Sequence, residues 1–153
     1  MTTMGRWTIA IILLGISAVL CAAAKDETID ELKARFEKSR VEERAELGMR
    51  IAQHQLQNAD KLYNDGKTAD ARAAVEDIVS YSEKARDAAT QTNKRLKNVE
   101  IDARKMADKL RDIKRTLAFE DQSAVEQAIR RLENVRTTLL KEMFAKDEKK
   151  RKK

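Results

Sequence analysis

Few side chains in this 153-residue sequence are of the types that carry out catalysis. His54 is the only histidine and Cys21 the only cysteine. A catalytic site requires a nucleophile beside a base, a cluster of metal ligands or a glycine-rich loop that holds phosphate, and the sequence has none of these patterns. One histidine and one cysteine do not suffice for a transition-metal site. We therefore expect a protein that is not an enzyme, with no catalytic residue, cofactor, bound metal or small-molecule substrate.

Positive charge is concentrated at the C-terminus. The chain carries a net charge of +6, and its last eight residues contribute six cations against two carboxylates. The terminal run consists of Lys149, Lys150, Arg151, Lys152 and Lys153. Such a run is usually a solvated chain end, so the sequence predicts a flexible basic tail over residues 146–153. The alternative is that this tail binds an anionic membrane surface, at about 1 kcal/mol for each basic residue near the surface.

Nucleic acid is not an expected partner. Aromatic side chains make up 4% of the sequence, and none lies within the basic run to stack on bases. The expected partner is another protein or a second copy of this chain, with the anionic membrane surface as the alternative.

Residues 1–24 have the pattern of a secretory signal peptide. An arginine precedes an apolar run over residues 7–20, and small residues follow before the charged sequence begins. Cleavage is predicted between Ala24 and Lys25. The mature protein is therefore expected to be exported, either periplasmic or secreted.

Two alternatives to cleavage are left open by the sequence. Residues 7–24 are just long enough to span a membrane and would then anchor the chain in the inner membrane. Cys21 would carry the lipid of a lipoprotein, but Leu20 precedes it where a small residue is expected. The mature chain otherwise has no cysteine, so its stability must come from helix packing without disulfides.

The rest of the sequence is typical of long helices. It has no proline, few glycines and a high content of charged residues. β-Sandwiches and barrels need turn residues every few positions, so this composition excludes them. We predict an all-α fold of elongated antiparallel helical hairpins, similar to a coiled-coil bundle with one long central helix. Helices are expected at residues 28–64, 68–117 and 122–145.

The predicted central helix has the most regular pattern in the chain. From Ala71 to Leu117, apolar or small residues recur with an unbroken 4-3 spacing, which is a heptad seam. Its large C-terminal members are Leu96, Val99, Met106, Leu110, Ile113 and Leu117. They are predicted to form the core or a self-association interface. Threonine and asparagine are poor helix formers, so a break near Thr90–Asn93 is the alternative to one continuous helix.

Local signals mark the predicted helix ends. Thr28 and Glu31 match a capping box, as do Ser123 and Glu126. Gly66 supplies the left-handed conformation that ends a helix. Glutamate–cation pairs at i,i+4 spacing are expected to support the exposed faces. They are Glu31/Arg35, Glu46/Arg50, Glu100/Arg104, Glu126/Arg130 and Glu142/Lys146.

Short connections make neighbouring helices antiparallel. The turn between the first two helices is expected to set Leu47 opposite the small residues 82–85, because large side chains pack against small ones. The free ends of the first and third helices are expected to meet at residues 96–103, with Phe36 and Phe144 in the core. The two ends of the mature chain would then emerge close together.

Tyr63, Gly66 and Ala71 surround the first predicted turn. In the tetratricopeptide family a tyrosine and a glycine close the first helix of a repeat, and an alanine packs where the second helix begins. Residues 47–80 therefore resemble a single tetratricopeptide-like hairpin, and no second copy is present. The resemblance implies a helical hairpin that takes part in protein interactions.

These features predict an exported, non-enzymatic helical protein that acts as a structural or protein-interaction module of the periplasm or envelope. In its size, charge and predicted export the chain also looks like the periplasmic holdase chaperones, which makes a holdase one alternative. A peripheral membrane-surface protein that binds through the basic C-terminal tail is the other alternative.

Overall fold

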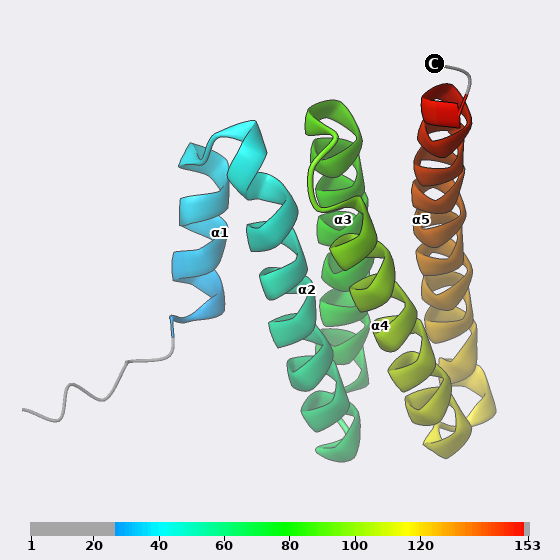
Figure 1. Cartoon of the computed structure of the whole chain (residues 1–153). Coiled ribbons are helices and arrows are strands. Elements are labelled where there is room, and N and C mark those ends of the chain that lie inside the picture. The colour runs from blue at the N-terminus through cyan, green and yellow to red at the C-terminus, as the bar shows by residue number, and fades with distance from the viewer. Residues whose placement is uncertain (1–26, 152–153) are drawn as a thin grey trace, which may run out of the picture.

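In the computed structural model, which describes residues 27–151, the chain forms five helices joined by short turns (Figure 1). They are α1 (Ile29–Lys38), α2 (Val41–Asn64), α3 (Thr68–Thr92), α4 (Leu96–Thr116) and α5 (Phe119–Arg151). No strand occurs in this part of the chain, so the prediction of an all-α fold is confirmed. The predicted cleavage site between Ala24 and Lys25 lies outside the described residues.

The first predicted helix is divided in two, which corrects the expected span of 28–64. It begins as predicted, with Thr28 and Glu31 forming both hydrogen bonds of a capping box. At Ser39 the backbone becomes extended, and the Ser39 hydroxyl donates a 2.7 Å hydrogen bond to the carbonyl of Phe36. Because the serine hydroxyl bonds to a carbonyl in the last turn of α1, the helix can end there, and α2 starts in a new direction.

The predicted central helix is also divided, so its continuity from 68 to 117 was wrong. Asn93 and Arg95 both adopt left-handed backbone conformations, with φ of 57° and 60°. Asparagine tolerates this conformation better than most residues, because its short polar side chain bonds locally. The break lies at the position that the sequence offered as the alternative, and it folds α4 back against α3.

The third predicted helix is longer than expected at both ends. It starts at Phe119 rather than at 122, so Ser123 lies inside the helix and does not cap it. It continues to Arg151, so residues 146–151 are helical and do not form a flexible tail. This stretch contains strong helix formers and no glycine or proline. Its cations also suit the negative end of the helix dipole.

The helices form two stacked hairpins, α2/α3 and α4/α5. The most extensive contacts lie within each hairpin, while α2 packs beside α4 and α3 beside α5. Figure 1 shows α4 in front of α3, with α1 and α5 at opposite edges of the array. Two layers result, with α2 and α4 in one layer and α3 and α5 in the other.

The position of α1 corrects the predicted meeting of the chain ends. Phe36 does not approach residues 96–103; its ring lies edge-on to Tyr81 of α3, with 5.3 Å between ring centroids. Lys33 forms a 2.6 Å ion pair with Asp77, also on α3. Because the break at Ser39 turns α1 back along the first hairpin, the described ends of the chain lie at opposite edges of the molecule (Figure 1).

The core follows the predicted seam despite the break. Every seam position from Ala71 to Leu117 is buried except Thr92 and Leu117, which are half-buried. Leu47 is buried and its neighbour Gly48 faces Ala85, as the predicted turn requires. A Cβ atom at Gly48 would lie 2.9 Å from the carbonyl oxygen of Tyr81. Glycine therefore allows α2 and α3 to approach closely at this point.

Ion pairs join the two hairpins in a common register. Glu46 pairs with Arg95 at 2.6 Å and Asp60 with Lys109 at 3.2 Å, and both pairs link α2 to α4. Within the layer formed by α3 and α5, Arg131 of α5 binds two carboxylates of α3. Of the predicted i,i+4 pairs, Glu126/Arg130 is the one that forms within the described residues. Glu46 and Glu100 pair instead with Arg95 and Arg136, which are distant in the sequence, because the packing of the helices brings these cations nearer.

Candidate functional site

The predicted seam residues lie inside the chain rather than on a free surface. Leu96, Val99, Met106, Leu110 and Ile113 are buried. Leu117 is half-buried and ends α4. They belong to the same apolar cluster as Val125 and Leu132 of α5. The first five are buried within one copy of the chain and Leu117 packs against them, which places these residues in the core.

The predicted basic run is carried by the end of α5. Lys149, Lys150 and Arg151 are its last helical residues, and Arg151 is exposed. Lys152 and Lys153 lie outside the described residues. The first part of the run therefore belongs to a helix rather than to a flexible tail.

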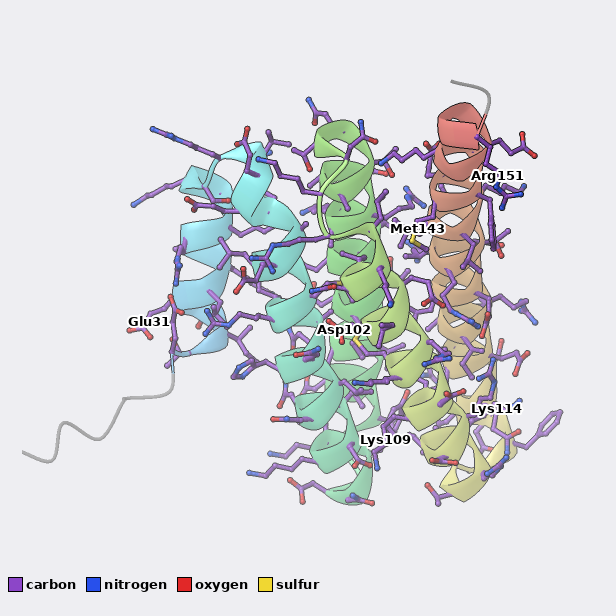
Figure 2. The ribbon with its side chains drawn as sticks, in the orientation of Figure 1. Glu31, Asp102, Lys109, Lys114, Met143 and Arg151 are labelled. Atoms are coloured by element: carbon purple, nitrogen blue, oxygen red, sulfur yellow. The ribbon has the colours of Figure 1, made fainter. Side chains whose placement is uncertain are left out.

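A groove lies on the surface where α2 and α4 run side by side. Its volume is about 90 Å³. Its apolar floor is formed by Ala45, Met49 and Val99, and its polar walls by Glu46, Arg50, Gln53, Arg95, Asn98 and Asp102. Figure 2 labels Asp102 near the middle of α4, at its border with α2. We call this feature the α2–α4 groove.

Most charges of the α2–α4 groove are already paired. Arg95 binds Glu46 at 2.6 Å, and Arg50 binds Glu27 at 3.4 Å. Asp102 has no ion-pair partner among residues 27–151. Burial raises the pKa of its carboxyl above the ordinary value, and the charge of Lys105 opposes this in part. The groove therefore offers a half-buried carboxylate that a cationic group from outside would stabilise.

A second hollow lies where α1 meets the first hairpin. Its volume is about 250 Å³, and Phe36, Val41 and Ala88 form its apolar part. Arg44 and Lys84 each lie 5.6 Å from the centroid of the Phe36 ring. These cations stack on the aromatic pair of the core, so they help to attach α1 to the first hairpin.

Two aromatic side chains are exposed at opposite ends of α5. Phe119 is 88% exposed at its first residue and Phe144 is 66% exposed near its last turns. Phe144 was predicted to lie in the core, and this was wrong. Phe144 lies seven residues after the exposed Thr137, and α5 runs on past the start of α4 (Figure 1).

The sequence did not reveal the α2–α4 groove. Its residues Arg50, Gln53 and Asn98 come from segments that were expected to lie in different parts of a long hairpin. Asn93 was the signal that could have found it, because a left-handed asparagine between two apolar patterns indicates a turn. That turn returns α4 alongside α2 and thereby creates the groove.

Two further properties concern residues 27–151 only. None of their helices has the length and apolar content needed to cross a membrane. Within the same range, no three histidine, cysteine, aspartate or glutamate side chains gather closely enough to hold a metal ion.

Comparison with known proteins adds no relative: no family model, no curated protein and no solved structure matches the chain.

Proposed function

We propose that this protein is an exported, non-enzymatic protein-interaction module whose binding surface is the α2–α4 groove. The observation that carries the proposal is the half-buried Asp102 carboxylate, which has no ionic partner in the described chain and lies beside the amides of Gln53 and Asn98. A lysine or arginine side chain of a bound peptide would pair with the carboxylate. The two amides would bond to the peptide backbone.

The stacked hairpins support an interaction role. Helix pairs stacked in the same direction expose a continuous face to which each pair contributes, and repeat proteins bind their partners on such faces. Here α2 and α4 contribute the same side of successive hairpins. This arrangement agrees with the interaction role implied by the tetratricopeptide-like resemblance of residues 47–80.

The ends of the stack favour a monomer. The outer face of α5 is exposed and polar along the bundle. Its members are Gln127, Arg130, Asn134, Thr137 and Lys141. Light scattering combined with small-angle scattering at two concentrations should give a monomer. A stable dimer would mean that this polar face, or the groove itself, is a self-association surface.

Export is tested on the full chain in an expressing bacterium. Fractionation should place the protein in the periplasm, and mass spectrometry should find Lys25 as its first residue. An intact N-terminus in the membrane fraction would instead support an anchor formed by residues 7–24.

The groove is tested by selecting peptides from a random display library on the purified protein. We expect enriched peptides to contain basic residues and to lose binding to Asp102→Asn. The matched control is Asp70→Asn, which changes an exposed carboxylate on α3 away from the groove. Peptides that bind both variants equally, or no enrichment at all, would contradict the proposed surface.

No observation in residues 27–151 favours the holdase alternative. A holdase needs an exposed apolar groove for its clients, and the exposed large apolar side chains here are Phe119 and Phe144, far apart on α5.

A further inference from the structure

A regular pattern of charge along the second hairpin changes at one end. On α5, Glu126, Glu133 and Leu140 occupy one face at heptad spacing. Glu126 pairs with Lys114 of α4, and Glu133 pairs with Arg111 at 2.6 Å. The next position in this row, Leu140, is apolar.

The facing row of α4 keeps its cations. Arg111, Arg104 and Lys97 follow the same heptad spacing. The antiparallel registers set by the ion pairs Glu100–Arg136 and Arg111–Glu133 place Lys97 level with the two turns of α5 that begin at Leu140. Lys97 is exposed and has no ion-pair partner among the described side chains, which do not include that of Asp147. Of this row, Arg111 pairs with α5, whereas Arg104 and Lys97 are exposed cations without an ion pair among the described side chains.

The start of α4 adds further positive charge. Lys94 precedes the helix and is exposed. The first turn of α4 has no acidic residue, and no side chain caps it. Helix N-termini carry partial positive charge, and acidic residues usually balance it. The α3–α4 turn is thus electropositive by composition and by backbone orientation.

An exposed apolar side chain lies on α5 at the same level. Phe144 is 66% exposed, and Leu140 and Met143 beside it are half-buried. Figure 2 labels Met143 on the stretch of α5 that leads towards Arg151. Lys141, three residues before Phe144, is exposed. The basic run begins five residues after Phe144, following Lys146 and two carboxylates.

We propose that these residues (Lys94, Lys97, Leu140, Lys141 and Phe144, here called the basic end) dock the protein on an anionic lipid bilayer. The lysines bind lipid headgroups, and Phe144 with Leu140 enters the interfacial region. Charge complementarity selects this partner, because the exposed cations Lys94, Lys97 and Lys141 share this end of the bundle with an exposed aromatic side chain. The inference does not rest on the α2–α4 groove, although Arg95 and Asn98 of the groove are the sequence neighbours of Lys94 and Lys97. It differs from adhesion by a flexible tail because fixed helical residues make the contact.

The experiment is sedimentation of the purified chain with vesicles of phosphatidylglycerol and phosphatidylcholine, compared with pure phosphatidylcholine. We expect binding to the anionic vesicles, weakened by added salt. Phe144→Ser should weaken it about tenfold, as expected for losing one inserted aromatic side chain. Lys94→Gln and Lys97→Gln should each weaken it about fivefold.

The opposite end of the molecule provides matched controls. Phe119→Ser removes an exposed aromatic residue from the same helix, and Lys61→Gln and Lys67→Gln remove exposed cations near the α2–α3 turn. These variants should bind like the parent chain. Because every variant retains residues 1–24, any contribution of that segment to vesicle binding is the same in all of them. Equal losses at both ends, or equal binding to neutral vesicles, would overturn the proposal.

Insertion is measured separately by fluorescence. In a Trp7→Phe background, which removes the native tryptophan, Phe144→Trp should show a blue shift on adding anionic vesicles, and Phe119→Trp should not. Because both residues are exposed, neither variant disturbs the core. Unshifted emission from a Phe144→Trp chain that binds the vesicles would contradict insertion and assign the binding to charge alone.

Discussion

The two hairpins pack by different means. In the first, α2 and α3 approach through rows of small side chains. These are Ala45, Gly48, Ala52, Ala59, Ala71, Ala74, Ala85, Ala88 and Ala89. In the second, α4 and α5 fill the interface mainly with large aliphatic side chains. These are Leu96, Val99, Met106, Leu110, Ile113, Val125, Ile129, Leu132, Val135 and Leu139.

The charged borders of the hairpins differ as well. Three ion pairs connect α4 to α5, whereas none connects α2 to α3 within residues 27–151. A hydrogen bond of 2.6 Å from Gln55 to Asp77 links the first pair of helices instead. Close backbone approach makes the first hairpin sensitive to added atoms. Large side chains and charges make the second sensitive to their removal.

The largest effect is expected from Leu110→Ala in the second hairpin. Leu110 is fully buried, so the change leaves a cavity and should lower the free energy of unfolding by about 2–5 kcal/mol. Leu117→Ala, at a half-buried position, should cost clearly less. Urea denaturation measures both, and equal costs would contradict the idea that this interface depends on buried volume.

Gly48→Ala should destabilise the first hairpin by about 1–3 kcal/mol, because the new methyl group meets the backbone of Tyr81. Elsewhere inside a helix the same change gains about 0.5–1 kcal/mol, so the sign is diagnostic. The control is Ala73→Val, which enlarges an exposed residue of α3 and should change stability by less than about 1 kcal/mol. A stabilised Gly48→Ala variant would mean that α2 and α3 are not held closely.

Arg136→Met tests the charged border of the second hairpin. It leaves Glu100, which is 8% exposed, without its cation and should cost about 1–2 kcal/mol. Arg115→Met breaks a pair whose arginine side chain is 74% exposed and should change stability by less than about 0.5 kcal/mol. If thermal denaturation finds the two variants alike, the border does not contribute to the difference between the hairpins.

The smallest effect is expected from pH. Burial tends to raise the pKa of Glu133, but Arg111 and Arg136 outweigh it and hold the pKa below the ordinary value. A carboxyl with a lowered folded pKa stabilises the fold above its unfolded pKa, and this contribution is lost as the pH falls through the folded value. The melting temperature should therefore decrease as the pH is lowered below about 4. Glu133→Gln should be less stable than the parent at neutral pH, and the difference should narrow in acid.

The sequence allowed the fold class and the buried face to be predicted, but not the path of the chain. The 4-3 seam survives the break at Asn93 because α3 and α4 both turn the same row of residues towards the interior. Periodicity therefore reports burial on both sides of a turn without revealing the turn. Ser39 ends α1 through a local hydrogen bond from its hydroxyl to the backbone. Serine has only a slightly unfavourable helix propensity, so propensity alone did not indicate that a helix would end at this residue.

The candidate site was harder to predict than the core. The α2–α4 groove depends on partners far apart in the chain, such as Glu46 with Arg95. The local spacing predicted a pair of Glu46 with Arg50 instead, because the i,i+4 rule considers only residues within one helix. Phe144 lies beside the apolar stripe of α5 rather than in it, seven residues after the exposed Thr137, so its hydrophobic character alone gave the wrong prediction.

The stacking of hairpins also has a consequence for how the chain folds. Each helix of the two hairpins makes its largest contact with a neighbour in sequence. Most of the core therefore forms between helices that are joined by short loops. Proteins rich in such local contacts fold quickly. A chain that emerges N-terminus first can close α2 against α3 before α5 exists, and the finished first hairpin then provides a template for the second. Folding by successive addition would leave little time for the alanine-rich face of α3 to meet another unfolded chain.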